Sequence, residues 1–279
     1  MLLMTNRRAV RASISSAILL AFAAAGSPSQ AATKVLVTVV EQRTGIPVKG
    51  LKAEDFSATE ERAARRVEAA EYVAAGLIDI MLLLDTSLVG PVVQPVASSF
   101  IAQLQPKEQM AVVAYDSSAT LIQSFTSSKE LLERAVSGVK FGNDPRLLDA
   151  LYAAIDGGFE NTSFRKVILL LTAGIEGPSR TGERDVIRLA RRNGVSIYPV
   201  YVSGYGRSLF ESLARQTGGA SFNLRDMRRS AGENPGPRVF EVLRSHYVLT
   251  LSGNLPPGER LKVDVRHPRK VNLSFLPLD

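Results

Sequence analysis

Short apolar runs alternate with amphipathic segments over residues 77–225 of the chain. The apolar runs have the length of strands buried on both faces, and they predict strands at Ile78–Leu84, Met110–Tyr115, Thr120–Phe125, Val167–Thr172, Val195–Val202 and Ala220–Asn223. The amphipathic segments predict helices at Val92–Leu104, Lys129–Val139, Leu147–Ile155, Glu183–Arg192 and Ser208–Gln216. This alternation favours a three-layer α/β fold, with a doubly wound, mostly parallel sheet covered by helices on both faces.

The third predicted strand departs from the alternation. Thr120–Phe125 follows Met110–Tyr115 after only a few residues, too few for a crossover helix. The two segments therefore predict a hairpin, which makes the third strand an antiparallel edge of the sheet. At the helix ends, Ser128 and Ser208 are placed as N-caps, and Gly194 follows the Arg-rich helix as a C-cap.

The flanking segments are predicted to be β-rich. Residues 34–73 contain strands at Lys34–Val40 and Arg66–Tyr72. Residues 226–279 begin with a linker rich in Pro and Gly, and the elements predicted after it are a short helix at Val239–Arg244 and strands at Tyr247–Leu251, Leu261–Arg266 and Val271–Phe275. We expect both flanks to form one small β region beside the domain of residues 77–225.

The N-terminal segment is typical of an export signal. Three arginines precede the apolar, Ala-rich run Ile14–Gly26, and small residues follow at Ser29 and Ala31. We expect residues 1–31 to be a signal peptide cleaved after Ala31, with an uncleaved anchor as the alternative. The mature protein is then periplasmic or extracellular in a bacterium, without stable membrane insertion. The pattern leaves open whether the Sec or the Tat pathway exports it.

Composition narrows the possible chemistry. The chain has no cysteine and only two histidines, which excludes disulfides and zinc–thiolate sites and leaves little material for histidine catalysis. The net charge of +7 falls to 7 − 3 = +4 once the three signal arginines are removed, which is too mild to favour nucleic-acid binding. Gly204-Tyr205-Gly206 lacks the third glycine of a dinucleotide fingerprint and is interpreted as an ordinary loop. We predict a protein that is not an enzyme and has no cofactor.

The apolar run Ile80–Leu84 ends in Asp85-Thr86-Ser87, at the strand end where open α/β sheets bind ligands. This stretch resembles the first metal-site motif of the von Willebrand factor A family. Later segments match the family in the same order: Met110–Tyr115, Leu148–Ala154, Val167–Gly174 and Ala214–Gly219. The resemblance covers about residues 77–225 and implies a vWA fold, which is Rossmann-like.

The flanks are similar to the exported "VWFA-related" proteins that are abundant in Acidobacteria. The similarity rests on Val35–Val40, Gly45–Leu51, Asp55-Phe56 and Leu243–Leu249. In this chain Glu61–Arg65 replaces the hairpin turn expected after Phe56, which leaves a strand pair at that place open.

The family resemblance implies a metal-ion-dependent adhesion site that holds Mg²⁺ or a similar ion. Its ligands would come from the Asp-x-Ser-x-Ser loop, from a threonine and from an aspartate after the fourth strand. Asp85 and Ser87 are present, but Val89, Pro145 and Ala173 stand at the other three positions, and none has a side-chain oxygen. We therefore predict that no metal binds. The alternative is a rearranged metal-dependent site that uses Asp85 and Ser87 as weak ligands together with Asp144 or Glu176.

The loops at this edge of the sheet are the predicted binding surface for a protein partner of unknown identity. They are Thr86–Pro91, Gly142–Arg146, Ala173–Gly182 and Ser203–Arg207. Leu88, Val89 and Val92 favour apolar contact that needs no metal, although these side chains could instead pack on the sheet. The candidate site therefore comprises Asp85, Ser87, Leu88, Val89, Pro145 and Ala173. A structural or assembly role in the cell envelope is the remaining alternative.

Overall fold

The structure is a computed structural model that describes residues 32–87, 90–141, 145–202, 204–231, 234–253 and 261–278. The chain divides into two compact units, Met1–Gln30 and Ala31–Asp279. The predicted signal peptide lies outside the described residues, and everything below concerns the second unit. None of the helices in the described ranges combines the length and the apolarity needed to cross a membrane.

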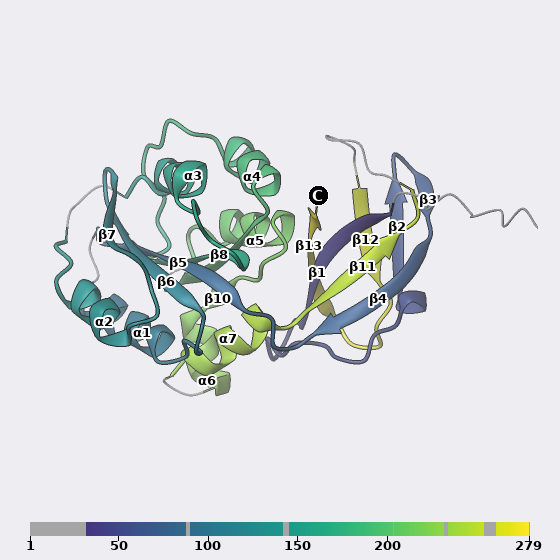
Figure 1. Cartoon of the computed structure of the whole chain (residues 1–279), viewed down its shortest axis with the longest axis horizontal. Coiled ribbons are helices and arrows are strands. Elements are labelled where there is room, and N and C mark those ends of the chain that lie inside the picture. Colours follow the sequence, from purple (N-terminus) through teal and green to yellow (C-terminus); the bar gives the residue numbers. More distant parts are fainter. Residues whose placement is uncertain are drawn as a thin grey trace, which may run out of the picture. The chain divides into compact units, whose positions relative to one another are not determined.

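A six-stranded sheet forms the centre of the α/β part, with the strand order β10-β9-β8-β5-β6-β7 (Figure 1). Its strands are β5 (Ile78–Asp85), β6 (Gln109–Tyr115), β7 (Ala119–Thr126), β8 (Arg165–Thr172), β9 (Val195–Tyr201) and β10 (Phe222–Asn223). All neighbours pair in parallel except β6 and β7, which form the predicted antiparallel hairpin at one edge. Every residue of β5 is buried, as expected for a central strand covered on both faces.

Helices cover both faces of this sheet. They are α1 (Gly90–Ile101), α2 (Lys129–Ser137), α3 (Leu147–Gly157), α4 (Glu183–Arg192), α5 (Arg207–Gln216), α6 (Leu224–Ala231) and α7 (Gly236–Arg244). One apolar core joins the sheet to α1, α2, α6 and α7, and a second core on the opposite face joins it to α3, α4 and α5. The three-layer α/β architecture predicted from the sequence is therefore confirmed.

The two flanks form one small β region. A four-stranded sheet has the order β13-β1-β11-β4, and a three-stranded sheet has the order β12-β2-β3. Their strands are β1 (Thr33–Glu41), β2 (Phe56–Glu60), β3 (Ala63–Arg65), β4 (Val67–Val73), β11 (His246–Leu251), β12 (Leu261–Val265) and β13 (Val271–Leu278), and the short 3₁₀ helix η1 (Ala53–Asp55) precedes β2. Val37 of β1 pairs with both Tyr247 and Phe275, so the N-terminal strand lies between two C-terminal ones.

The structure decides three local predictions, one about a hairpin and two about helix caps. The strand pair left open at Glu61–Arg65 is present, because Glu61 (φ 46°) and Arg62 (φ 77°) adopt left-handed conformations that close the β2–β3 hairpin. Ser128 caps α2 as predicted, through a hydrogen bond from the Leu131 nitrogen to its hydroxyl. The predicted cap at Ser208 is wrong, since α5 begins one residue earlier and its N-cap is Gly206.

Two consecutive glycines bring the β region close to the α/β part. The Thr38 hydroxyl donates a hydrogen bond to the Gly218 carbonyl at 2.8 Å, and the Ser274 hydroxyl donates one to the Gly219 carbonyl. Gly218 has a φ of +74°, and a Cβ there would lie 2.9 Å from the Cβ of Leu276. Glycine is required here both for its conformation and for this close approach.

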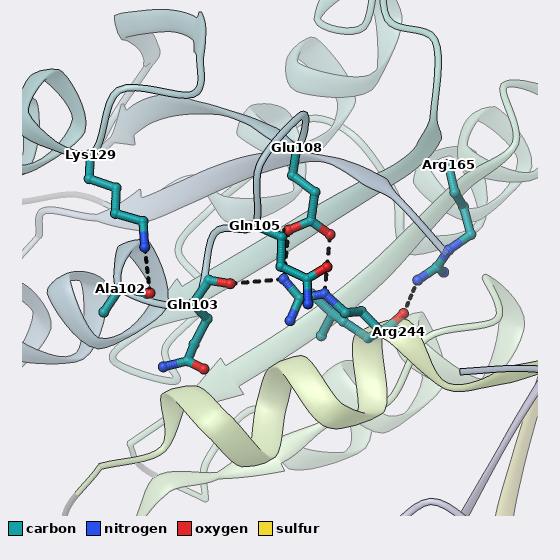
Figure 2. Close-up of polar contacts among 8 residues, drawn as sticks. Ala102, Gln103, Gln105, Glu108, Lys129, Arg165 and Arg244 are labelled. Atoms are coloured by element: carbon teal, nitrogen blue, oxygen red, sulfur yellow. Dashed lines mark hydrogen bonds and ion pairs between the residues drawn. The ribbon is translucent and has the colours of Figure 1, made fainter. Parts of the chain in front are cut away.

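A buried ion pair fixes helix α7 to the edge of the six-stranded sheet at which the parallel strands begin (Figure 2). The Arg244 guanidinium donates to both carboxylate oxygens of Glu108, at 3.1 and 2.6 Å, and to the Gln103 carbonyl at 2.8 Å. The same carboxylate accepts the main-chain N–H of Gln105. Arg165 donates to the Leu243 carbonyl near the end of the helix. The contacts of Arg244 with Glu108 and Gln103 join segments more than 130 residues apart in the sequence.

Candidate functional site

Asp85 is the last residue of β5, and it lies beside the last residues of two neighbouring strands. It is opposite Tyr115 of β6, and because Leu84 is opposite Leu171, it also lies next to Thr172 of β8. The carboxyl ends of parallel strands meet at one edge of a sheet, so the sequence places these three side chains together. The Asp85 side chain is fully buried, with an exposed fraction of 0%.

The Asp85 carboxylate accepts four hydrogen bonds from the protein itself. Oδ1 accepts the main-chain N–H of Ser87 at 2.9 Å and the Ser87 hydroxyl at 2.5 Å. Oδ2 accepts the Thr172 hydroxyl at 2.9 Å and the main-chain N–H of Ala173 at 2.9 Å. A buried carboxylate needs such donors, and two on each oxygen give it full coordination. The site is therefore closed by direct hydrogen bonds.

Tyr115 and Thr86 complete the buried surroundings of Asp85. The Thr86 main-chain nitrogen and hydroxyl both donate to the Tyr115 carbonyl, at 2.9 and 3.0 Å. The Tyr115 hydroxyl is buried near Thr172 and Asp85, but its geometry to the described residues is not that of a hydrogen bond. Burial, reinforced by the negative charge of Asp85, raises the pKa of Tyr115 well above its ordinary value. Tyr115 is therefore neutral at physiological pH and offers no charge to a ligand.

Pro145 and Ala173 lie at the two loop positions where the sequence lacks the expected side-chain oxygens. The Pro145 carbonyl accepts the main-chain N–H of Gly177 at 2.7 Å, and a Cβ on Gly177 would lie only 2.3 Å from that oxygen. Ala173 is nearly buried and contributes its main-chain nitrogen to Asp85. The loop between β8 and α4 is thus held against Pro145 by a main-chain hydrogen bond.

Glu176 and Asp149 hold this loop against the first turn of α3. Glu176 Oε1 accepts the Leu148 main-chain N–H at 3.5 Å, and burial raises the pKa of Glu176. Asp149 accepts the main-chain N–H groups of Arg180 and Thr181. Although partial desolvation opposes it, these bonds hold the pKa of Asp149 below its ordinary value. Glu176 therefore stabilises the end of a helix, where a negative charge is favourable.

The residues brought together here do not fit a Mg²⁺ site of the expected kind. Mg²⁺ requires several prepositioned oxygen ligands in nearly octahedral geometry. Both oxygens of Asp85 already have two donors each, and Pro145 and Ala173 supply no side-chain oxygen. The described residues also contain no group of three or more His, Cys, Asp or Glu side chains that could hold a metal. Three sequence-predicted candidates, Leu88, Val89 and Asp144, lie outside the described residues.

Two exposed side chains at this edge were not singled out from the sequence. Ile175, in the loop after β8, is 44% exposed, and Tyr205, in the loop after β9, is 91% exposed. The main-chain nitrogen of Gly206 donates to the Gly174 carbonyl at 3.1 Å, which ties the two loops together next to both side chains. The only sequence signal was an aromatic residue between two glycines, Gly204 and Gly206, directly after a strand.

Solved structures with the same fold include proteins of distant origin. The chain is similar to proximal thread matrix protein 1 from the mussel byssus, in a structure with a zinc-occupied MIDAS motif, at 20% identity and a TM-score of 0.54. That alignment covers 66% of this chain and 50% of the mussel chain, so this chain spans about half the length of its relative.

An aerotolerance-related membrane protein from Bacteroides fragilis is similar at 10% identity and a TM-score of 0.50, over 60% of this chain and 99% of that one. At these identities the two likenesses establish the fold alone. No curated protein matches the sequence.

The family model of the von Willebrand factor type A domain matches residues 79–233. This match begins within β5, includes Asp85, Pro145, Ala173 and Tyr205, and covers more than half of the chain. With the parallel sheet, its antiparallel edge strand and the position of Asp85 at the carboxyl edge, sequence and structure agree: the chain belongs to the von Willebrand factor type A family.

Proposed function

We propose that this protein is an exported, non-catalytic protein-interaction module that binds its partner without a metal ion. The partner surface is the group of loops at the carboxyl edge of the sheet. The observation that carries the proposal is the Asp85 carboxylate, whose two oxygens are fully occupied by four donors of the chain. This edge keeps the architecture of the family together with Asp85 and Ser87, while Val89, Pro145 and Ala173 replace the other three ligands.

We infer metal independence from the hydrogen bonds that surround Asp85. A buried carboxylate without a cation requires hydrogen-bond donors, and Thr172 and Ala173 supply two of them from the neighbouring strand end. Glu176, the nearest alternative ligand in the sequence, is engaged at the first turn of α3. A cation that recruited Asp85 would have to break the hydrogen bonds from Thr172 and Ala173.

Apolar contact replaces metal-mediated contact in this account. Ile175 and Tyr205 present a large aliphatic and a large aromatic side chain from two loops that are joined by a hydrogen bond. Aromatic anchors are among the side chains that contribute most to protein–protein interfaces. A partner with an apolar surface of its own fits this edge.

The environment of Ser87 and the positions of the two histidines support a non-catalytic role. The Ser87 hydroxyl donates to Asp85 and is buried with it, so it is not presented to a substrate as a nucleophile. His246 and His267, the only histidines, lie in the β region. The N-terminal pattern of arginines, apolar run and small residues supports export to the periplasm or the cell exterior.

Affinity capture from the native cell envelope, performed with EDTA throughout, tests the proposal. The double variant Ile175→Asp/Tyr205→Asp is compared with the wild type, and Ile46→Asp, which alters a comparably exposed isoleucine in the β region, is the matched control. We expect the same partner to be captured by the wild type and by the control, and to be lost in the double variant. Capture that requires Mg²⁺, or that survives in the double variant, contradicts the proposal.

A further inference from the structure

We propose that two copies of this chain associate through the free edge of β7, in antiparallel orientation, to form a sheet that continues from one copy into the other. This surface is distinct from the loops of the proposed function. The argument rests on the open strand, on the groove beside it and on the charges at its two ends.

Strand β7 has a paired neighbour on one side only within the described ranges. It ends the order β10-β9-β8-β5-β6-β7, and Figure 1 shows it at the outer edge of the sheet, between α2 and α3. The sequence Ala119–Thr126 contains no charged residue and no proline. Edge strands usually avoid pairing with other chains through charges, prolines or β-bulges; β7 carries no charge and no proline, and its protection is limited to the irregular register with β6.

An apolar groove of about 370 Å³ follows the same strand on its α3 side. Leu121 and Phe125 of β7 form one wall, and the α3 segment from Ala153 to Gly157 forms the other. Gly158 also lines the groove, and a Cβ there would lie 2.1 Å from the Ala154 carbonyl oxygen and 2.4 Å from the Met81 Cε. A side chain from a paired strand would enter this groove and bury its apolar surface.

Exposed apolar side chains are concentrated around this edge. Leu121 and Ile122 are adjacent in β7 and are 58% and 40% exposed. The helices that contact β7 each add one more exposed large side chain, Leu131 on α2 and Tyr152 on α3. Several exposed apolar side chains on and beside one edge strand favour an interaction site there.

The charges that flank β7 favour a second copy over an unrelated strand. Asp116 precedes the strand by three residues and accepts the Ser118 main-chain N–H in its own turn. Lys129 follows the strand by three residues, and its exposed ammonium group donates one hydrogen bond, to the Ala102 carbonyl. In antiparallel pairing about the middle of β7, Asp116 of each copy approaches Lys129 of the other, whereas parallel pairing would bring like charges together. Cross-strand pairs of opposite charge stabilise a sheet and like pairs destabilise it.

The register shifts between β6 and β7 limit the strength of this association. On β6 they occur between Met110 and Val112 and between Val112 and Val113. The extra residues lie on the partner strand, so β7 is the strand that bends. A bent strand forms a short ladder, so we expect a reversible dimer whose population depends on protein concentration.

Cross-linking tests the geometry directly, because the wild-type chain contains no cysteine. Gln123→Cys and Ser124→Cys, made separately in the full chain, place a thiol near the middle of β7. Under mild oxidation we expect at least one of them to give a disulfide-linked dimer. Ser208→Cys, which places an exposed thiol on α5, is the matched control and should remain monomeric.

Charge exchange tests the orientation in sedimentation experiments on the full chain. Asp116→Lys and Lys129→Asp should each weaken dimerisation by about three- to tenfold, and the double exchange should restore it. Asp116→Asn keeps a side-chain acceptor for the turn and should give an intermediate loss. A wild type that stays monomeric at every accessible concentration overturns the proposal. So does a dimer that neither Leu121→Lys nor the charge changes affect.

Discussion

The Oδ2 atom of Asp85 accepts a hydrogen bond from the main-chain nitrogen of Ala173 at 2.9 Å. Family resemblance places an acidic metal ligand at position 173, and here that position instead supplies a donor to the neighbouring acid. A carboxylate at position 173 would lie next to the buried, negatively charged Asp85, and the two groups would repel each other unless a cation neutralised them. This relationship leads to the first prediction.

Ala173→Asp should destabilise the protein by about 2 kcal/mol or more, because two adjacent carboxylates cannot both remain ionised in a buried site. Ala173→Ser, which adds a small uncharged hydroxyl group in place of a carboxylate, should lower the free energy of unfolding much less. Urea unfolding with and without Mg²⁺ measures both variants. Full recovery of the Ala173→Asp variant by Mg²⁺ would show that a ligand set persists around Asp85 and would contradict this account.

Tyr115→Phe should leave the free energy of unfolding unchanged or raise it by up to about 1 kcal/mol. The Tyr115 hydroxyl is buried and has no partner in the described part of the chain, so its removal abolishes a desolvation cost without breaking a hydrogen bond. Thermal and urea unfolding provide the measurement. A clear loss of stability would reveal a hydrogen bond from this hydroxyl that supports Asp85.

The stability of the protein should fall between about pH 6.5 and pH 3, in part because of His246. Burial, with a contribution from the positive charge of Arg165, lowers the pKa of His246 to about 3. The unfolded chain takes up this proton near pH 6.5 and the folded chain does not, so the stabilisation is fully present above pH 6.5 and is lost as the pH falls. The slope from this group is at most about 1.4 kcal/mol per pH unit.

His246→Gln isolates that contribution. Glutamine keeps a polar side chain of similar size but does not titrate, so the variant should show a shallower decline of stability over this pH range than the wild type. Identical slopes for the variant and the wild type in urea unfolding at several pH values would show that the pKa of His246 does not differ between the folded and the unfolded chain.

The pair of Glu108 and Arg244 should be a strongly coupled structural contact. Removing either partner leaves the other charge buried, which typically costs about 3–5 kcal/mol. Glu108→Gln, Arg244→Met and the double variant form a thermodynamic cycle. We expect the double variant to be less destabilised than the sum of the single variants, and additive effects would contradict the coupling.

Sequence patterns predicted the sheet because each strand is indicated by residues that lie next to one another in the sequence. Ile78–Leu84 is buried on both faces and reads as a continuous apolar run, and the few residues between β6 and β7 allow only a hairpin. Asp85 was placed from the sequence at the strand end where open α/β sheets bind ligands, and its hydrogen bond with Thr172 obeys the same rule, although that contact was not predicted. The positions that lack ligand oxygens were also visible in the sequence.

Non-local pairing could not be predicted in the same way. Glu108 and Arg244 are 136 residues apart, and no pattern in either segment specifies the other. The β2–β3 hairpin was left open because Glu61 and Arg62 are not residues that favour left-handed conformations, and only the completed ladder explains them. The exposure of Ile175 and Tyr205 depends on how two loops are tied together, which sequence periodicity does not report.

Isothermal titration of the wild-type protein with Mn²⁺ and with Mg²⁺ tests the central claim, that this family member acts without a metal. The account predicts no saturable binding in the micromolar range, and the same result for Asp85→Asn. One-site micromolar binding to the wild type that disappears in Asp85→Asn would contradict it.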